Sequence, residues 1–325
     1  MSGPSAYRAP WWLPGSHLQT IWPLARKGAT PAYRRERWDT PDGDFIDLDW
    51  SPGGGAEAPL VVLFHGLEGS SRSHYAQTLM RAVNARGWRG VVPHFRGCSG
   101  APNRLPRAYH SGDSEEIDWI LQRLHQLAGS APLFAAGVSL GGNALLKWLG
   151  ERGPQARTVL QSAAAVCAPL DLTISGHALG CGFNRLYTLH FLDTLKRKAL
   201  AKCARDPDLF DAQRIRRAHT LYAFDDAYTA PAHGFAGADD YWRRASSKPW
   251  LSAIRCPTLL LNAANDSFVP AAALPDAADL SPAVRFECPS GGGHVGFLNG
   301  PWPGSQDWLA QRLLRHFDTS RQTDI

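Results

Sequence analysis

The fold is decided by residues 132–146, PLFAAGVSLGGNALL, in which a short apolar run leads into the pentapeptide GVSLG at residues 137–141. The apolar run predicts a buried strand, and the residues from Ala144 onward predict a helix. Ser139 lies between them on a sharp turn, where glycines two positions before and after it remove side chains that would collide with the neighbouring strand and helix. The pattern predicts a nucleophilic serine at the carboxyl edge of a sheet; the alternative is a tight turn whose serine caps the helix.

Strands and helices alternate on both sides of this stretch. Residues 34–39 and 45–50 flank the turn sequence PDGD and predict a hairpin. Apolar runs predict further strands at residues 60–64, 90–95, 133–138, 158–166, 258–262 and 284–288. Further helices are expected at residues 74–86, 114–127 and 305–317. The alternation favours the α/β fold class, with a mostly parallel, doubly wound sheet and helices on both faces.

The alternation of predicted strands and helices stops between residues 169 and 250. This interruption predicts a helical cap inserted over the sheet edge. We therefore expect a core of residues 1–168 and 251–325 and a cap of residues 169–250. The cap contains a basic amphipathic segment at residues 186–204. Its positive charges are typical of a solvated helix face, and attraction to a membrane surface or an acidic substrate is the alternative.

The first forty residues are rich in proline, tryptophan and arginine. The prolines at positions 10, 14 and 23 interrupt any long helix, and the tryptophans require burial. We expect an arm that lies across the core. Simple packing is favoured over a function in which the arm lines an acyl pocket.

Composition argues against nucleic-acid binding and against a cysteine zinc site. The chain has 325 residues and 44% hydrophobic content, which is enough for a substantial core. Its net charge of +5 comes without long basic runs interleaved with aromatic residues, which argues against a nucleic-acid partner. The six cysteines are scattered, without the paired spacing of a zinc site, and predict free thiols in a reducing compartment.

The amino-terminal sequence carries no targeting signal. Residues 1–14 lack the basic start and apolar core of an export signal. No window of the chain approaches the roughly 18 consecutive apolar residues of a membrane span. We expect a cytoplasmic protein, and transient contact with a membrane surface remains open.

A serine hydroxyl is a weak nucleophile and needs a base that a carboxylate orients. The expected chain order for this architecture is serine, acid and then histidine. Asp266 lies just past the predicted strand at residues 258–262, where the ligand-facing loops of open α/β sheets lie. The rival acids Asp276 and Asp279 fall in a helix expected after that strand. The sequence therefore predicts Asp266 as the orienting acid.

His294 is the predicted base. It lies in a glycine-rich loop after the last predicted strand. Among the twelve histidines, His65 falls at an early strand end, His110 precedes a helix and His17 belongs to the arm. None of these three follows both Ser139 and a strand-end aspartate, as His294 does.

The oxyanion of an acyl-transfer intermediate needs preorganised donors, normally backbone N–H groups. Leu140, immediately after the serine, offers one at a helix start, and Leu67 in the sequence HGL of residues 65–67 is the predicted second. The alternative is that Gly66 and Gly69 only shape a turn.

With these residues in hand, the chain resembles the α/β-hydrolase superfamily. Within it the chain is similar to the YheT-type hydrolases, the branch that also contains membrane-associated abhydrolase-domain lipid esterases. The segments that carry the resemblance span nearly the whole chain: residues 14–20 (PGSHLQT), 65–70 (HGLEGS), 95–100 (FRGCSG), 137–143 (GVSLGGN), 224–226 (FDD), 233–235 (HGF) and 292–297 (GGHVGF).

The resemblance implies ester hydrolysis with Ser139 as nucleophile, Asp266 as acid and His294 as base. The family often has Asp-Asp-Pro where this chain has Asn265-Asp266-Ser267, which keeps the second aspartate and is expected to loosen the turn after it. The amino-terminal membrane helix of the animal relatives has no counterpart in this sequence, so membrane residence is not carried over.

These observations predict a serine hydrolase that cleaves carboxylic esters through an acyl-enzyme. The expected substrates are small esters or lipids, with short to medium acyl chains or a monoacylglycerol-like structure, and no metal or organic cofactor is expected. A thioesterase or acyltransferase would use the same three residues. A binding protein on a hydrolase scaffold is the non-enzymatic alternative. The sequence leaves the acyl length, the alcohol and the oligomeric state open.

Overall fold

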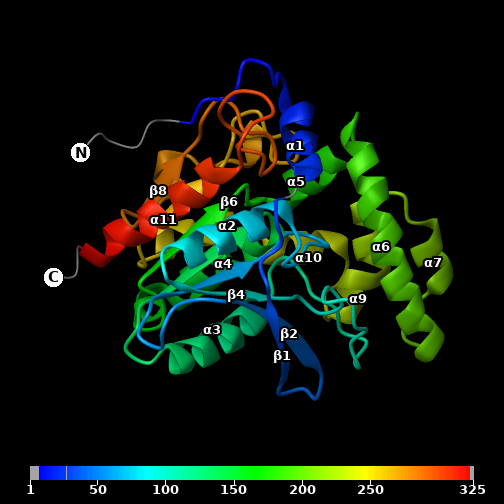
Figure 1. The fold of residues 1–325 in the computed structure, drawn as a ribbon. Helices are drawn as coiled ribbons and strands as arrows, with labels where there is room; N and C mark the ends of the chain where they lie inside the picture. Colours follow the sequence, from blue (N-terminus) through cyan, green and yellow to red (C-terminus); the bar gives the residue numbers. More distant parts are fainter. Residues whose placement is uncertain (1–6, 27, 323–325) are drawn as a thin grey trace.

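One eight-stranded sheet organises the protein, in a computed structural model that describes residues 7–26 and 28–322 (Figure 1). Residues 1–6, which belong to the stretch predicted to carry no export signal, lie outside the described part of the chain. The strands are β1 (Arg34–Asp39), β2 (Phe45–Ser51), β3 (Leu60–Phe64), β4 (Arg89–Pro93), β5 (Leu133–Val138), β6 (Ser162–Val166), β7 (Thr258–Leu261) and β8 (Val284–Glu287).

The strand order is β1-β2-β4-β3-β5-β6-β7-β8. β2 pairs antiparallel with both β1 and β4, and each remaining neighbouring pair is parallel. The predicted mostly parallel α/β sheet is thereby confirmed. All five residues of β3 and all six of β5 are buried, as strands covered on both faces require.

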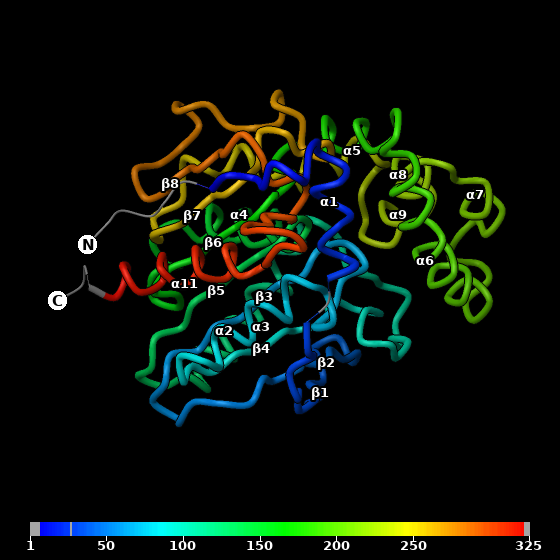
Figure 2. Tube along the Cα trace, turned by 45° about the horizontal axis from the view of Figure 1, so that its top comes forward, coloured from blue at the N-terminus to red at the C-terminus, as the bar shows by residue number. Residues whose placement is uncertain are grey.

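Helices cover both faces of the sheet (Figures 1 and 2). One apolar core lies between the sheet and helices α3 and α4, and a second lies between the sheet and helices α2 and α11. The helices are α1 (Ser16–Ala25), α2 (His74–Ala85), α3 (Ser114–Ala128), α4 (Leu140–Arg152), α5 (Leu172–Leu179), α6 (Asn184–Arg205), α7 (Ala212–Arg217), α8 (Leu221–Phe224), α9 (Ala230–Ala232), α10 (Ala238–Ala245) and α11 (Asp307–Gln322).

Two segments differ from the prediction. The strand expected from residue 158 begins at Ser162, because Gly153–Thr158 forms a 3₁₀ helix. The helix expected after β7 is replaced by two 3₁₀ turns, Ala271–Ala273 and Ala277–Asp279. Pro154 lies in the first turn of the 3₁₀ helix, a position that suits proline. Pro270 and Pro275 precede the two 3₁₀ turns and interrupt the longer helix that was expected there.

Helices α5 to α10 follow β6 in the region where the sequence predicts a helical cap, and the cap boundaries at residues 169 and 250 stay a prediction. Figure 2 shows α6 and α7 at one side of the molecule, far from α11 and β8. Two lysines of the basic segment at residues 186–204 have partners outside α6, whereas attraction of this segment to a membrane surface or an acidic substrate stays a prediction. Lys198 Nζ lies 2.7 Å from Glu68 Oε2, and Lys202 Nζ donates to the Pro106 carbonyl at 3.1 Å. These two lysines attach α6 to the core.

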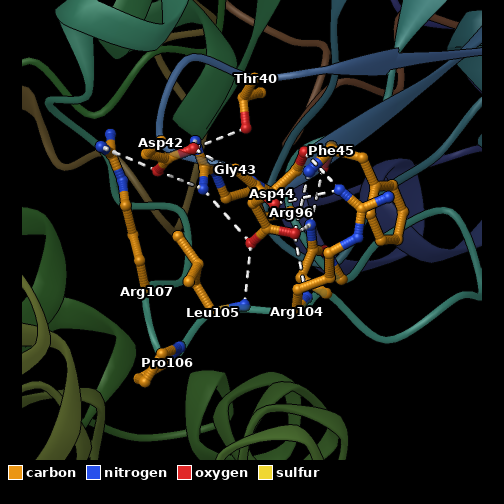
Figure 3. Close-up of polar contacts among 12 residues, drawn as sticks. Thr40, Asp42, Gly43, Asp44, Phe45, Arg96, Arg104, Leu105, Pro106 and Arg107 are labelled. Carbon is orange, nitrogen blue, oxygen red and sulfur yellow. Dashed lines mark hydrogen bonds and ion pairs between the residues drawn. The ribbon is translucent and has the colours of Figure 1, made fainter.

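A cluster of charges ties the β1–β2 turn to the loop after β4 (Figure 3). The same cluster reaches α3 through Glu116. The Arg96 side chain, 3% exposed, contacts Asp42 at 2.8 Å, Asp44 at 3.3 Å and Glu116 at 2.5 Å. Asp44 also accepts hydrogen bonds from the backbone N–H groups of Arg104 and Leu105. Because buried carboxylates need partners, Arg96 holds three separate segments together.

Replacing this arginine tests the cluster. Arg96→Met leaves Asp44 and Glu116 buried without their cation, and we expect it to lower the free energy of unfolding by about 3–5 kcal/mol. Urea unfolding followed by circular dichroism measures the change. The control is Arg197→Met, which breaks a pair with Asp193 in which both side chains are 69% exposed, and should cost less than about 0.5 kcal/mol. Equal effects of the two substitutions would contradict this assignment.

Candidate active site

Ser139 lies on a strained turn between β5 and α4. Its backbone angles are φ 53° and ψ −120°, and residues other than glycine rarely adopt a positive φ. The flanking glycines are required by close contacts. A Cβ on Gly137 would lie 2.5 Å from the Gly141 oxygen, and a Cβ on Gly141 would lie 2.5 Å from the Phe64 oxygen. The turn therefore holds Ser139 beside the carboxyl end of β3.

The structure brings Ser139, His294 and Asp266 together. His294 Nε2 lies 3.0 Å from Ser139 Oγ, and His294 Nδ1 lies 2.8 Å from Asp266 Oδ2. The Asp266 side chain is fully buried and that of His294 is 12% exposed. When Nδ1 carries the ring hydrogen and donates a hydrogen bond to the Asp266 carboxylate, the unprotonated Nε2 can accept the serine proton.

The turn after Asp266 is closed, although the sequence Asn265-Asp266-Ser267 predicts a looser one. Asp266 Oδ1 accepts from the Phe268 N–H at 2.8 Å. The Phe268 ring also stacks on His294, with centroids 4.2 Å apart. This aromatic contact, which the sequence analysis missed, fixes the plane of the imidazole.

The rival residues have other contacts. Asp276 and Asp279 form a capping box around a 3₁₀ turn. His65 is fully buried, its Nε2 accepts from the Phe95 N–H at 3.1 Å, and burial lowers the pKa of its ring to about 3. His17 stacks on Tyr187 of α6 and lies tilted against Phe183, the residue before α6, and His110 lies against His233.

Gln19 of helix α1 joins the loop that carries Asp266 to the loop that carries His294. Its Oε1 accepts from the Gly292 N–H at 2.8 Å and from Asn265 Nδ2 at 3.0 Å. Asn265 Oδ1 in turn accepts from the Gly293 N–H at 3.0 Å. An asparagine suits position 265 because aspartate has no N–H to donate to Gln19.

Thr20, the next residue of α1, contacts His294 itself. Its Oγ1 accepts from the His294 backbone N–H at 2.9 Å and donates to the Ser16 carbonyl at 2.8 Å. Sequence reasoning favoured simple packing of the arm and missed this contact. The available signal was the segment PGSHLQT, which belongs to the resemblance and contains both residues.

The loop after β3 lies next to the serine. A Cβ on Gly66 would lie 3.2 Å from the Ser139 Cβ. The N–H groups of Gly66 and Glu68 donate to the hydroxyls of Tyr75 and Tyr109, each at 2.9 Å. Leu67, between these anchored residues, lines the same cavity as Ser139 and Leu140. Glu68 has φ 54° and is held from the other side by Lys198 of α6.

A cavity of about 520 Å³ opens over Ser139 and His294. Apolar side chains from α5, α6 and α8 form much of its wall, and Thr20 and Leu24 of α1 also line it. Such a cavity, whose wall is mainly apolar beside Ser139, suits a small molecule with an apolar part. The arm therefore does contribute to the lining, which the sequence analysis considered the less favoured alternative.

One group of side chains within the described residues has the composition and spacing of metal ligands: Cys167, Asp266 and His294. A thiol binds metal as the thiolate. Burial, followed by the Asp266 charge, raises the pKa of Cys167 well above its usual value, which disfavours the thiolate. The donor set therefore fits a metal poorly, and its aspartate and histidine are bonded to each other.

The fold is that of a known family. The profile of the alpha/beta hydrolase fold family matches residues 59–301, and the chain belongs to that family. It is 41% identical over 302 residues to the Escherichia coli protein named "Putative esterase YheT", covering 91% of this chain and 88% of that protein. The resemblance to YheT-type hydrolases is thereby confirmed.

Two other proteins are also similar. Human "Phospholipase ABHD3" is 30% identical over 323 residues, covering 96% of this chain and 78% of that protein. Among solved structures, the Pyrococcus furiosus esterase PF2001 superimposes with a TM-score of 0.57 at 15% identity, covering 88% of this chain and 91% of that one. The structural likeness supports the fold. Within the described residues, no helix combines the length and the apolar character needed to span a bilayer.

The contact between Thr20 and His294 predicts a positioning effect. Thr20→Val keeps the shape of the side chain but removes the acceptor for the His294 N–H. We expect kcat for ester hydrolysis to fall roughly ten- to a hundredfold, because small displacements of a catalytic group are costly, while KM changes little. Steady-state kinetics with a nitrophenyl ester measure both. Thr20→Ser retains the hydroxyl and should restore kcat; a valine variant with wild-type kcat would refute the role.

Proposed function

We propose that this protein is a serine hydrolase that cleaves carboxylic esters through an acyl-enzyme on Ser139. The observation that carries the proposal is the continuous hydrogen-bonded chain from Ser139 through His294 to Asp266, which opens on an apolar cavity. Nucleophile, base and orienting acid are the three groups that such a reaction requires.

In the proposed first step, His294 Nε2 takes the proton of Ser139 as Oγ attacks the ester carbonyl. Asp266 stabilises the imidazolium that forms. The N–H groups of Leu67 and Leu140 hold the oxyanion; Leu140 is suited to this because it is the first residue of α4 and its N–H has no helical partner. The alcohol then leaves with the proton from His294.

In the second step the same base activates water. Water attacks the acyl carbonyl, His294 accepts its proton, and the carboxylic acid is released as Ser139 recovers its hydrogen. No step needs a metal or an organic cofactor. Product analysis with methanol as a competing acceptor separates hydrolysis from acyl transfer, because transfer would form the methyl ester.

The proposed substrates are short- to medium-chain esters or monoacylglycerol-like lipids. Support comes from the cavity, whose wall includes Leu172, Phe191 and Leu195 of the cap helices. The names of two similar proteins, "Putative esterase YheT" and "Phospholipase ABHD3", also refer to enzymes that cleave ester bonds.

Substitution of the nucleophile tests the proposal. Ser139→Ala should lower kcat/KM for nitrophenyl butyrate by about 10⁴-fold or more, as loss of a catalytic serine does, with little change in melting temperature. The matched control is Ser252→Ala at an exposed serine, which should keep wild-type activity. Substantial hydrolysis by the Ser139→Ala protein would show that the serine is not the nucleophile.

A further inference from the structure

An acidic side chain that the proposed reaction does not use lies in the substrate cavity. Asp225 lines the cavity together with Leu221, Phe224 and Trp242 of the cap. It begins a π-helical turn, Asp225–Thr229, which connects α8 to α9. π-Helical turns are rare and occur often at functional sites.

The carboxyl group of Asp225 has only neutral partners. Its Oδ1 accepts from Thr229 Oγ1 at 2.7 Å, and its Oδ2 accepts from Trp242 Nε1 at 2.8 Å. Among the residues that the structure describes, no lysine or arginine pairs with it. Burial raises the pKa of this carboxyl to about 6, so it is mostly ionised at neutral pH.

An unpaired carboxylate in an apolar cavity is costly, and each of its oxygens keeps a further lone pair. The adjacent Asp226 shows what an ordinary structural acid does in this turn. It pairs with Arg214 at 2.7 Å near the surface and accepts from the Ala238 N–H. Asp225 therefore retains acceptor capacity that a substrate can use.

The surroundings favour a hydroxyl over a quaternary cation as the bound group. A cation would need an open aromatic face. The Trp242 ring is instead covered by neighbours: a Cβ on Gly176 would lie 2.5 Å from it, and His177 and Tyr222 contact it edge to face at 5.4 and 5.3 Å between centroids. The Trp242 face is therefore closed to a cation, and the Asp225 carboxylate keeps its remaining acceptor sites for a hydroxyl.

We propose that Asp225 is a specificity-determining residue that accepts a hydrogen bond from a free hydroxyl on the alcohol part of the ester. The hydroxyl is assigned to the alcohol because a simple fatty acyl chain carries no hydrogen-bond donor. The protein then prefers esters of polyols, such as glycerol, over esters of plain alkyl alcohols. This inference rests on the proposed ester hydrolysis and names the substrate class for it.

A matched substrate pair tests the inference. Glyceryl 1-monobutyrate and propyl butyrate share the acyl group and the three-carbon alcohol, and differ in two hydroxyls. We expect the wild-type protein to have the higher kcat/KM for the glyceryl ester. Asp225→Asn should lower the ratio of the two kcat/KM values roughly ten- to a hundredfold, as loss of a hydrogen bond to a charged group does. Asp226→Asn is the control and should leave the ratio unchanged.

The melting temperature shows whether the variant is folded. The raised pKa means that ionisation of Asp225 above pH 6 destabilises the folded state, so Asp225→Asn should melt at or above the wild-type temperature at pH 8. If Asp225→Asn is unfolded, Asp225→Ser replaces it in the same assay, because it also removes the carboxylate and keeps a hydroxyl for the two neighbours.

Three results would overturn the inference. These are equal wild-type kcat/KM values for the two esters, a ratio that the loss of the carboxylate leaves unchanged, and a preference for butyrylcholine that Asp225→Asn removes, which would assign the carboxylate to a cation. Failure of the wild-type protein to hydrolyse any of these esters would contradict the proposed function itself, and the inference would fall with it.

Discussion

The contact between Ser139 Oγ and His294 Nε2, 3.0 Å long, is the interaction on which the proposed chemistry depends. The two residues of this contact are held in place by different means. Ser139 is held by backbone strain at a turn that only glycine neighbours permit. His294 is held by side chains: Asp266 on one ring nitrogen, Phe268 on the ring face and Thr20 on the backbone N–H. A rigidly held serine thus faces a histidine whose position depends on its neighbours.

Two segments outside the sheet complete this arrangement. The amino-terminal arm contributes α1, whose Gln19 and Thr20 connect the loop of Asp266 to the loop of His294. The cap contributes α6, whose Lys198 pairs with Glu68 in the loop that carries Leu67. The cap also forms much of the cavity wall and places Asp225 in it. In the proposed reaction, the sheet sets the position of Ser139, and the arm and the cap helices set the position of His294 and the shape of the substrate cavity.

The sheet could be predicted from the sequence because its signals are local: apolar runs such as residues 60–64, with a turn after each. The same logic predicts Ser139, Asp266 and His294, since each follows a strand and the chain order is restricted. The contacts of Gln19 with Gly292 and of Lys198 with Glu68 join residues more than a hundred positions apart. Neither contact has a periodic signature, so neither could be predicted from a single sequence.

The most direct test of the central claim is to map the residue that a fluorophosphonate modifies. Such reagents phosphonylate a serine only when a neighbouring base activates it. After incubation of the full chain, peptide mass spectrometry should find one stoichiometric adduct, on Ser139, and substitution of His294 by alanine should prevent it. An unmodified protein, or an adduct on a different serine, would contradict the account.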